Sequence, residues 1–108
     1  MSPTPFQLKV YQLCSQIPQG KVTTYQEIAK ALHTKAYQAV GQALRCNPYA
    51  PKIPCHRVVA SNGSIGGFMG QTTGDKITTK IQLLRKEGVT IINNRINLHQ
   101  FNHTFSSR

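Results

Sequence analysis

Residues 24–46 read TYQEIAKALHTKAYQAVGQALRC, and this stretch predicts two short helices joined by a tight turn. The first helix is expected from Tyr25 to Leu32, because one of the two threonines before it can cap its N-terminus. Residues 33–35 break the helical pattern, and a second helix is expected from Ala36 to Cys46. The order of helix, short turn and helix is typical of a helix-turn-helix unit.

The second of these helices carries small residues at Ala36, Ala39, Gly41 and Ala43. Small side chains let a helix approach its neighbour closely, whether that neighbour is DNA or another helix. The local pattern therefore fits a DNA-binding helix-turn-helix and an ordinary packed helix pair equally well.

The charge of the chain is strongly positive. In 108 residues, 13 Lys and Arg stand against 3 Asp and Glu, which gives a formal net charge of +10 at pH 7. Such a chain attracts polyanions, and the neutralisation of phosphates supplies most of the sequence-independent affinity for nucleic acids. Nucleic acid is therefore the expected partner, although a basic composition that only aids solubility is an alternative. The charge favours the helix-turn-helix interpretation.

Length and cysteine content narrow the class of protein. A chain of 108 residues is expected to form one domain, and no apolar run approaches the roughly 20 residues of a membrane-spanning helix. The cysteines, Cys14, Cys46 and Cys55, show no CxxC spacing, which argues against a disulfide framework and a zinc site. The N-terminus lacks the features of a signal peptide. We therefore expect a reduced intracellular protein without a metal, in the cytoplasm and nucleoid of a prokaryote or the nucleus of a eukaryote.

The rest of the chain predicts a few further elements. Amphipathic helices are expected from about Pro5 to Gln16 and from about Asp75 to Glu87. Residues 61–70 read as a glycine-rich loop, residues 89–98 as a hairpin or pair of short strands, and residues 100–108 as a flexible tail. The expected fold is mainly α with short β-strands, a winged-helix-like helix-turn-helix domain over residues 1–99.

Cys55 lies in the heptapeptide IPCHRVV at residues 53–59, where a histidine and an arginine follow the thiol directly. A cysteine attacks as its thiolate, and the pKa of a free thiol is about 8.5, so a reactive cysteine needs a base or a positive field. His56 can accept the proton directly or through a water, and Glu87 is the best candidate to orient it. A buried and inert thiol is the alternative.

The same heptapeptide resembles the active-site motif of the O6-alkylguanine-DNA alkyltransferases, and other segments follow in that family's order. GKVTTYQEIA at residues 20–29 resembles the strand and first helix of the family's helix-turn-helix, and AVGQA at 39–43 resembles its recognition helix. GSIGGF at 63–68 resembles its substrate loop, and residues 83–88 its closing helix. The resemblance runs from about Phe6 to Val89 and implies the DNA-binding and catalytic domain with its cysteine active-site loop. We expect no counterpart of the family's N-terminal domain.

The resemblance implies that an alkyl group passes from a flipped-out O6-alkylguanine to Cys55, in a reaction that each chain performs once and without a cofactor. His56 would act through a water as the base, oriented by Glu87. Tyr25 would donate a hydrogen bond to the departing guanine, and Asn47 would hold the hinge after the recognition helix. The residues expected to line the substrate pocket are Val58, Phe68, Met69 and Gly70.

Double-stranded DNA carrying the lesion would be bound through its minor groove by a single chain, with little sequence specificity because minor-groove readout is degenerate. The residues expected to contact DNA are Thr24, Ala36, Tyr37, Gln38, Ala39, Gly41, Arg45 and Arg57. The family usually has an arginine at the position of Gln38, inserted into the duplex in place of the flipped base. Gln38 or Tyr37 would have to fill that place.

Two other functions stay open on the sequence. Alkyltransferase-like proteins are short relatives that bind the lesion without transfer and flag it for nucleotide excision repair proteins. They usually replace the reactive cysteine, which this chain keeps as Cys55. A basic helix-turn-helix regulator with an inert thiol would leave the heptapeptide and the glycine-rich loop unexplained.

Overall fold

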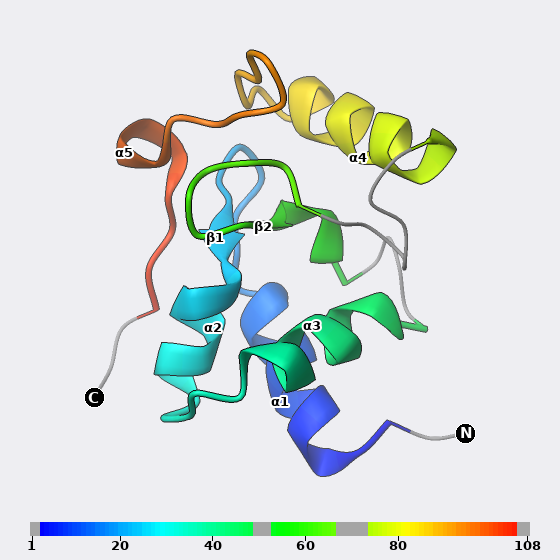
Figure 1. Cartoon of the computed structure of the whole chain (residues 1–108), viewed down its shortest axis with the longest axis vertical. Helices are drawn as coiled ribbons and strands as arrows, with labels where there is room; N and C mark the ends of the chain where they lie inside the picture. Colours follow the sequence, from blue (N-terminus) through cyan, green and yellow to red (C-terminus); the bar gives the residue numbers. More distant parts are fainter. Residues whose placement is uncertain (1–2, 49–52, 67–73, 106–108) are drawn as a thin grey trace.

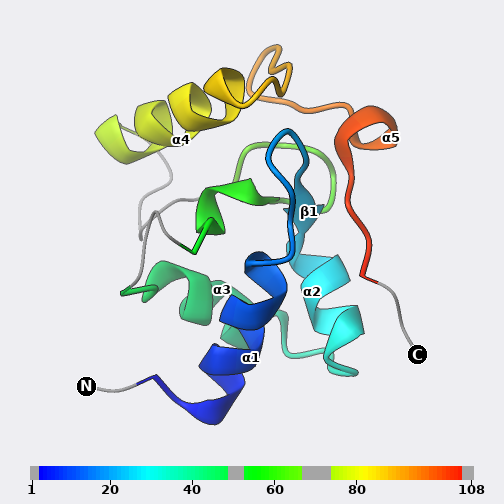
Figure 2. The ribbon, with the colours of Figure 1, turned by 180° about the vertical axis from the view of Figure 1, so that it is seen from behind.

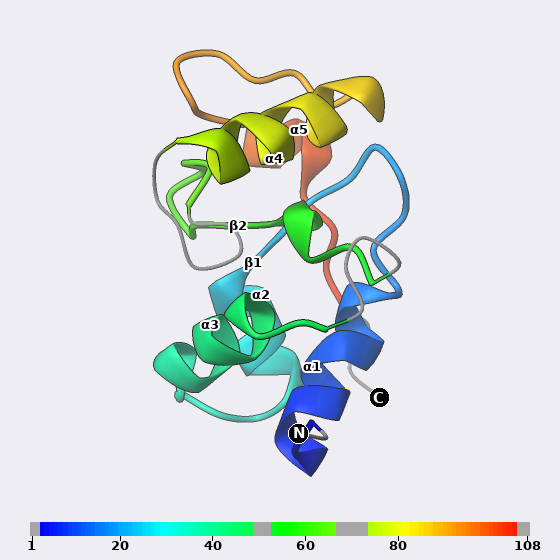
Figure 3. The ribbon, with the colours of Figure 1, turned by 90° about the vertical axis from the view of Figure 1, so that its right-hand side faces the viewer.

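The structure, a computed structural model, describes residues 3–48, 53–66 and 74–105. Its helices are α1 (Pro5–Cys14), α2 (Tyr25–Ala31), α3 (Tyr37–Arg45), the short 3-10 helix η1 (Cys55–Arg57), α4 (Asp75–Lys86) and α5 (Leu98–Phe101). Its strands are β1 (Thr23–Thr24) and β2 (Val58–Val59). Helices α1, α2 and α3 form one group, α4 and α5 lie on the opposite side, and the strands lie between (Figure 1, Figure 3). The expected mainly helical fold with short strands is confirmed.

Helix α1 begins with a reciprocal cap and supports α3. The Thr4 hydroxyl accepts a hydrogen bond from the Gln7 N–H, and the Gln7 side chain accepts one from the Thr4 N–H. The buried residues of the helix are Val10, Tyr11 and Cys14. The Tyr11 hydroxyl donates to the carbonyl of Ala43 at 2.7 Å, which ties α1 to α3.

Helices α2 and α3 form the expected helix-turn-helix. Thr24 caps α2, because its hydroxyl accepts a hydrogen bond from the Glu27 N–H at 3.1 Å. The Thr23 hydroxyl instead donates to the carbonyl of His103 at 2.9 Å. After α2, His33 takes a left-handed backbone conformation with φ 56°, which redirects the chain toward α3.

Helix α3 presents one face to the core and another to solvent. Its buried residues are Val40, Ala43 and Leu44. Of its small residues, Ala43 packs inward, whereas Ala39 is exposed and a Cβ added at Gly41 would meet nothing within 4 Å. The remaining exposed side chains of the helix are Tyr37, Gln38, Gln42 and Arg45. Most of the small residues therefore leave open surface instead of filling a helix contact.

The two strands join the segment around Cys55 to the start of α2. β1 and β2 pair in parallel, with Thr23 opposite Val58 and Thr24 opposite Val59, and all four residues are buried. β1 leads directly into α2, and β2 follows η1 directly. The N-terminus of α2 is therefore held beside the end of η1.

A tight hairpin turn follows α4. Asn93 and Asn94 have φ angles of 53° and 58°, and Ile92 and Arg95 exchange two backbone hydrogen bonds of 3.0 Å. Two left-handed residues in succession are the signature of a type I′ hairpin turn, for which asparagine is well suited. The hairpin expected in residues 89–98 is confirmed at this turn.

The chain after α5 runs beside β1 (Figure 1, Figure 2). Asn102 forms a parallel bridge with Val22, and the His103 N–H donates to the Val22 carbonyl at 2.6 Å. The flexibility expected from residue 100 onward concerns motion and stays a prediction. In the part of the chain that the structure describes, no helix has the length and apolar character needed to cross a membrane.

Candidate active site

Cys55 is the first residue of η1 and its side chain lies in the core, with the residue 5% exposed. The Asn47 side chain hydrogen-bonds the thiol and also donates from Nδ2 to the carbonyl of Ile53 at 3.1 Å. Burial raises the pKa of the Cys55 thiol above its usual value, against the Asn47 hydrogen bond and the positive charge of Lys80. The resting thiol is therefore protonated at neutral pH, and nucleophilic attack requires a base.

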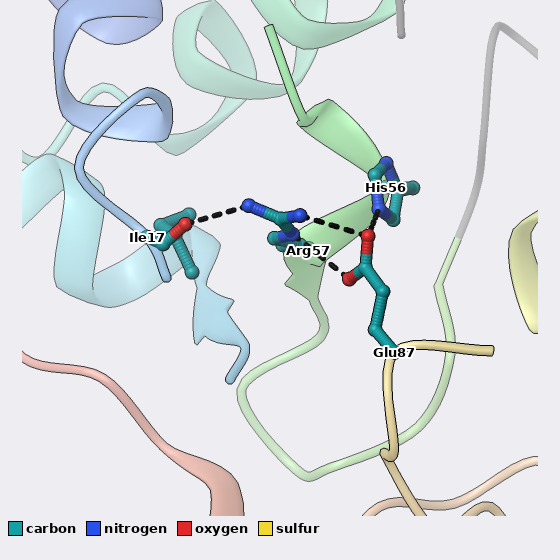
Figure 4. A network of polar contacts seen from close by, with 4 residues as sticks. All are labelled: Ile17, His56, Arg57 and Glu87. Carbon is teal, nitrogen blue, oxygen red and sulfur yellow. Dashed lines mark hydrogen bonds and ion pairs between the residues drawn. The ribbon is translucent and has the colours of Figure 1, made fainter. Parts of the chain in front are cut away.

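His56, the next residue, is buried and in contact with an acid. Its Nε2 lies 3.0 Å from Oε2 of Glu87, at the end of α4 (Figure 4). Burial lowers the pKa of the imidazole, and the hydrogen bond to Glu87 opposes this without reversing it. A carboxylate only accepts hydrogen bonds, so the neutral ring donates from Nε2 and keeps Nδ1 as its acceptor. The histidine is thus in the form that can take up a proton.

Glu87 is held by Arg57 as well as by His56. Arg57 donates from Nε to Oε1 at 2.9 Å and from a terminal nitrogen to Oε2 at 2.8 Å, and its other terminal nitrogen donates to the Ile17 carbonyl at 2.8 Å (Figure 4). Burial alone would raise the pKa of Glu87, but the hydrogen bonds from Arg57 and His56 hold it below its usual range. The carboxylate is therefore ionised at neutral pH.

Lys80 is a functional candidate that sequence reasoning missed. It lies on α4, is 0% exposed, and donates from Nζ to the carbonyls of Val58 at 2.8 Å and Ile65 at 2.6 Å. Burial lowers its pKa to about 7, and the negative charge that Cys55 carries when ionised opposes this shift. The signal was present in the helical spacing, since Lys80 falls on the same face as Ile77 and Leu84.

A hollow of about 590 Å³ joins the start of α2 to the outer face of α3, and its size is in the range of small-molecule sites. Its lining residues are Tyr25, Gln26, Tyr37, Gln38, Gly41 and Ser61. The Tyr25 hydroxyl lies against Gly66, where φ is 72° and an added Cβ would come within 3.3 Å of it. Glycine at this position therefore allows the tyrosine to approach the loop backbone.

A second hollow of about 310 Å³ lies on the other side of Tyr37 and is basic. Its lining residues are Gln26, Lys30, His33, Thr34, Lys35 and Tyr37. Tyr37 is 47% exposed and contributes to both hollows. Cations and an exposed aromatic ring are therefore gathered at the turn of the helix-turn-helix.

The expected site residues fall into two groups. Cys55, His56, Glu87 and Asn47 meet around η1, and Tyr25 lies with Tyr37, Gln38 and Gly41 around the larger hollow. Ala36, Ala39 and Arg45 are exposed at or on α3, and the Thr24 side chain is occupied in capping α2. Val58 is buried in β2 with its carbonyl bound by Lys80. Phe68, Met69 and Gly70 lie outside the described residues.

Arg57 was expected to contact DNA, and in the structure its side chain makes bonds within the protein. Its side chain is 16% exposed and its guanidinium is occupied by Glu87 and Ile17. The structure therefore places it in the Glu87 network, and its contact with DNA stays a prediction.

The sequence profile of the family described as "6-O-methylguanine DNA methyltransferase, DNA binding domain" matches residues 5–89. The chain belongs to this family. The resemblance seen in the sequence is thereby confirmed for the domain that carries the helix-turn-helix.

Curated relatives of this family member are archaeal methyltransferases. A bifunctional methyltransferase/endonuclease of Picrophilus torridus is 44% identical over 101 residues, which are 91% of this chain and 32% of the relative. A methylated-DNA–protein-cysteine methyltransferase of Saccharolobus solfataricus is 49% identical over 87 residues, which are 81% of this chain and 53% of the relative. The chain thus spans between a third and about half the length of these relatives.

Solved structures of two kinds resemble this family member. The O6-methylguanine-DNA methyltransferase of Pyrococcus kodakaraensis has a TM-score of 0.68 at 44% identity, over 80% of this chain and 47% of that one. Atl1 of S. pombe, in complex with damaged DNA containing O6-carboxymethylguanine, has a TM-score of 0.81 at 29% identity, over 99% of this chain and 100% of that one.

Proposed function

We propose that this chain repairs O6-alkylguanine in duplex DNA by transferring the alkyl group to the sulfur of Cys55. The observation that carries the proposal is the neutral, buried His56 beside Cys55, with its Nε2 hydrogen-bonded to an ionised Glu87 at 3.0 Å. A buried thiol with a raised pKa needs such a base. The methyltransferases among its relatives support the same reaction.

The chemistry follows from these groups. His56 takes the thiol proton through a water, and Glu87 stabilises the imidazolium that forms. The thiolate attacks the alkyl carbon in line with the carbon–oxygen bond, so that a carbon–sulfur bond forms and the electron pair of the broken bond stays on guanine O6. The departing guanine anion takes a proton from water, aided by a hydrogen bond from Tyr25, and the imidazolium of His56 returns its proton to water. One alkyl group is transferred and one thiol is consumed.

Delivery of the base uses the outer face of α3. The hollow lined by Tyr25, Gln38 and Gly41 is where we place the flipped base on its way to Cys55, with Tyr37 or Gln38 filling the gap left in the duplex. Lys30 and Lys35 in the second hollow neutralise phosphates of the DNA backbone. The lesion-bearing DNA is bound through its minor groove by one copy of the chain.

A second candidate function is recognition of the lesion without transfer. It is favoured by the likeness to Atl1, which extends over 99% of this chain and all of that one, whereas the methyltransferase of Pyrococcus kodakaraensis matches over 80% of this chain. Gln38, where an arginine is usual, also fits a protein that performs only part of the reaction. Such a protein would mark the lesion for nucleotide excision repair proteins.

One experiment separates the candidates. The protein is incubated with duplex DNA carrying O6-methylguanine, and its intact mass is then measured. Transfer predicts that a methyl group replaces one hydrogen in the wild type, and that Cys55→Ala shows no change although it still binds the DNA. Tight, lesion-selective binding with an unchanged mass would exclude transfer and support the second candidate. Binding without preference for the lesion would contradict both.

A further inference from the structure

The guanidinium of Arg57 connects two distant parts of the fold. It donates two hydrogen bonds to the carboxylate of Glu87, at 2.9 and 2.8 Å, and a third to the carbonyl of Ile17 at 2.8 Å (Figure 4). Two parallel bonds from one planar group fix the plane of the carboxylate as well as its distance. The bond to Ile17 fixes the guanidinium in turn, against the turn that follows α1.

Arg57 and His56 share one oxygen of Glu87. Oε2 accepts from Arg57 at 2.8 Å and lies 3.0 Å from Nε2 of His56. The oxygen that orients the imidazole is therefore the one that the guanidinium holds. If Arg57 were absent, the carboxylate could rotate about its own side chain, and the imidazole would lose a fixed partner.

Arg57 also balances charge at a buried site. An ionised carboxylate next to a buried imidazole favours the imidazolium, which cannot accept a further proton. The charged groups that act on His56 are Lys80 from α4, Glu87 from the C-cap of that helix, and Arg57 from η1. Cys55 is the neighbour of His56 in the chain, and Cys14 from α1 interacts with Cys55. Among these described groups, Glu87 supplies the negative charge at neutral pH, and Arg57 is the cation bonded to it.

We propose that Arg57 is a positioning residue for the chemistry of Cys55: by clamping Glu87 and offsetting its charge, it keeps His56 oriented and neutral. The inference rests on the proposed function, in which His56 accepts the thiol proton. It assigns to Arg57 a place behind the base, without contact with the substrate.

The test measures two quantities in Arg57→Gln. Single-turnover methyl transfer from O6-methylguanine DNA is followed between pH 5 and 9, and the pKa of His56 is followed by NMR of histidine-labelled protein. Because Arg57 then no longer offsets the charge of Glu87 at His56, we expect the acid limb of the rate profile and the His56 pKa both to move up by about one pH unit. Arg85→Gln is the matched control, since the Arg85 side chain also donates to a backbone carbonyl, but to that of Ile91 and not beside the carboxylate of Glu87.

A double variant tests whether Arg57 acts on His56 through Glu87. In Arg57→Gln combined with Glu87→Gln, most of the shift caused by Arg57→Gln should disappear, because the charge that Arg57 offsets is gone. A shift of equal size with and without Glu87 would overturn the proposal. So would a rate that falls by the same factor at every pH in Arg57→Gln, with the His56 pKa unmoved, because that is the behaviour of a merely structural residue.

The test also decides the proposal if the wild type is inactive or if Arg57→Gln does not fold. If the wild type transfers no methyl group, the proposed function fails, and the NMR titration alone decides whether Arg57 holds the pKa of His56 down. If Arg57→Gln does not fold, Arg57→Lys replaces it. Lysine keeps the charge and loses the paired bonds, so we expect a lower rate with an unmoved acid limb. An unchanged rate would overturn the proposal that the paired bonds of Arg57 position Glu87. A shift of the acid limb would overturn the proposal that the charge of Arg57 offsets that of Glu87.

Discussion

At the scale of single residues, the site combines groups whose ionisation states differ from those of exposed side chains. Burial raises the pKa of Cys55 and lowers those of His56 and Lys80, while hydrogen bonds from its partners hold Glu87 ionised. Nucleophile and base are therefore both neutral at rest. Transfer of the proton creates a thiolate on Cys55 and an imidazolium on His56, and the ionised Glu87 stabilises the imidazolium.

His56→Gln should slow methyl transfer by two orders of magnitude or more, the range by which a positioned general base accelerates reactions, about 10² to 10⁴. Glutamine keeps a polar side chain but cannot take up the thiol proton. The measurement is the single-turnover rate at pH 7.5, with His99→Gln as control because His99 is exposed on α5. A rate within threefold of the wild type would exclude His56 as the base.

The lowered pKa of Lys80 predicts how the free energy of unfolding depends on pH. Its pKa is about 7 in the folded chain, against 10.5 as the ordinary value. Above pH 7 the unfolded chain therefore binds more protons at this residue, and the free energy of unfolding should rise with pH. The pKa of Cys14, raised to about 12, acts in the opposite direction once unfolded thiols ionise. The window for the Lys80 effect is thus from pH 7 to about 8.5.

Urea denaturation at several pH values in that window tests the prediction. The wild type should gain stability between pH 7 and 8.5, and Lys80→Met should lose most of this slope. Lys76→Met removes the same charge from an exposed position on the same helix, and its slope should match the wild type. A slope that survives in Lys80→Met would show that another group titrates.

At the scale of elements, α3 combines a buried face that fixes it on α1 with an outer face that is open. Val40, Ala43 and Leu44 anchor the helix, and the Tyr11 hydroxyl holds the carbonyl of Ala43. The outer face can therefore change its side chains without loss of the core. Under the proposed function, a change at Gln38 affects the delivery of the base and leaves the chemistry at Cys55 intact.

Gln38→Arg should increase the rate of methyl transfer at saturating DNA. An arginine in the hollow beside Tyr25 adds a charge and a planar group that can stack in the place of the flipped base. Gln42→Arg is the control, because it adds the same charge on α3 outside the lining of that hollow. If both variants accelerate transfer equally, charge alone explains the gain. An unchanged rate in Gln38→Arg would indicate that Tyr37 already fills the duplex.

At the scale of the whole molecule, the positive charge is spread over both groups of helices. The two hollows described above lie at the group that contains α2 and α3. Under the proposed function, the net charge of +10 brings DNA to the chain, and the arrangement of α2 and α3 decides which face receives it. Helix α4 lies on the opposite side of the strands (Figure 3). Its exposed lysines, Lys76 and Lys86, are therefore expected to contribute to the long-range field more than to contacts with DNA.

The salt dependence of binding to lesion-free duplex DNA distinguishes the lysines that contact phosphates from those that contribute only to the long-range field. Each lysine that neutralises a phosphate contributes about one unit to the slope of log K against log salt. Lys30→Gln and Lys35→Gln should each reduce the slope by about one. Lys76→Gln on α4 should leave it nearly unchanged, and equal effects of all three would argue against a defined DNA-binding face.

The sequence by itself determined the order of elements, the helix-turn-helix and the family. Caps, helical periods and turn residues act over a few positions, so a threonine cap before α2, the two helices themselves and the turn at Asn93–Asn94 could be predicted one segment at a time. Which of Thr23 and Thr24 caps the helix was left to the structure. The contact of His56 with Glu87 was expected from the scarcity of acids, and the structure has it.

Only the tertiary structure decided how the basic residues are used. Arg57 pairs with a carboxylate 30 positions away, and Lys80 binds carbonyls 22 and 15 positions away. Burial of a cation costs free energy unless the fold brings hydrogen-bond acceptors to it. Here the acceptors reach Arg57 and Lys80 because α4 packs against η1 and β2. A count of charges cannot distinguish such a cation from one that faces DNA, because both read as Lys or Arg in the sequence.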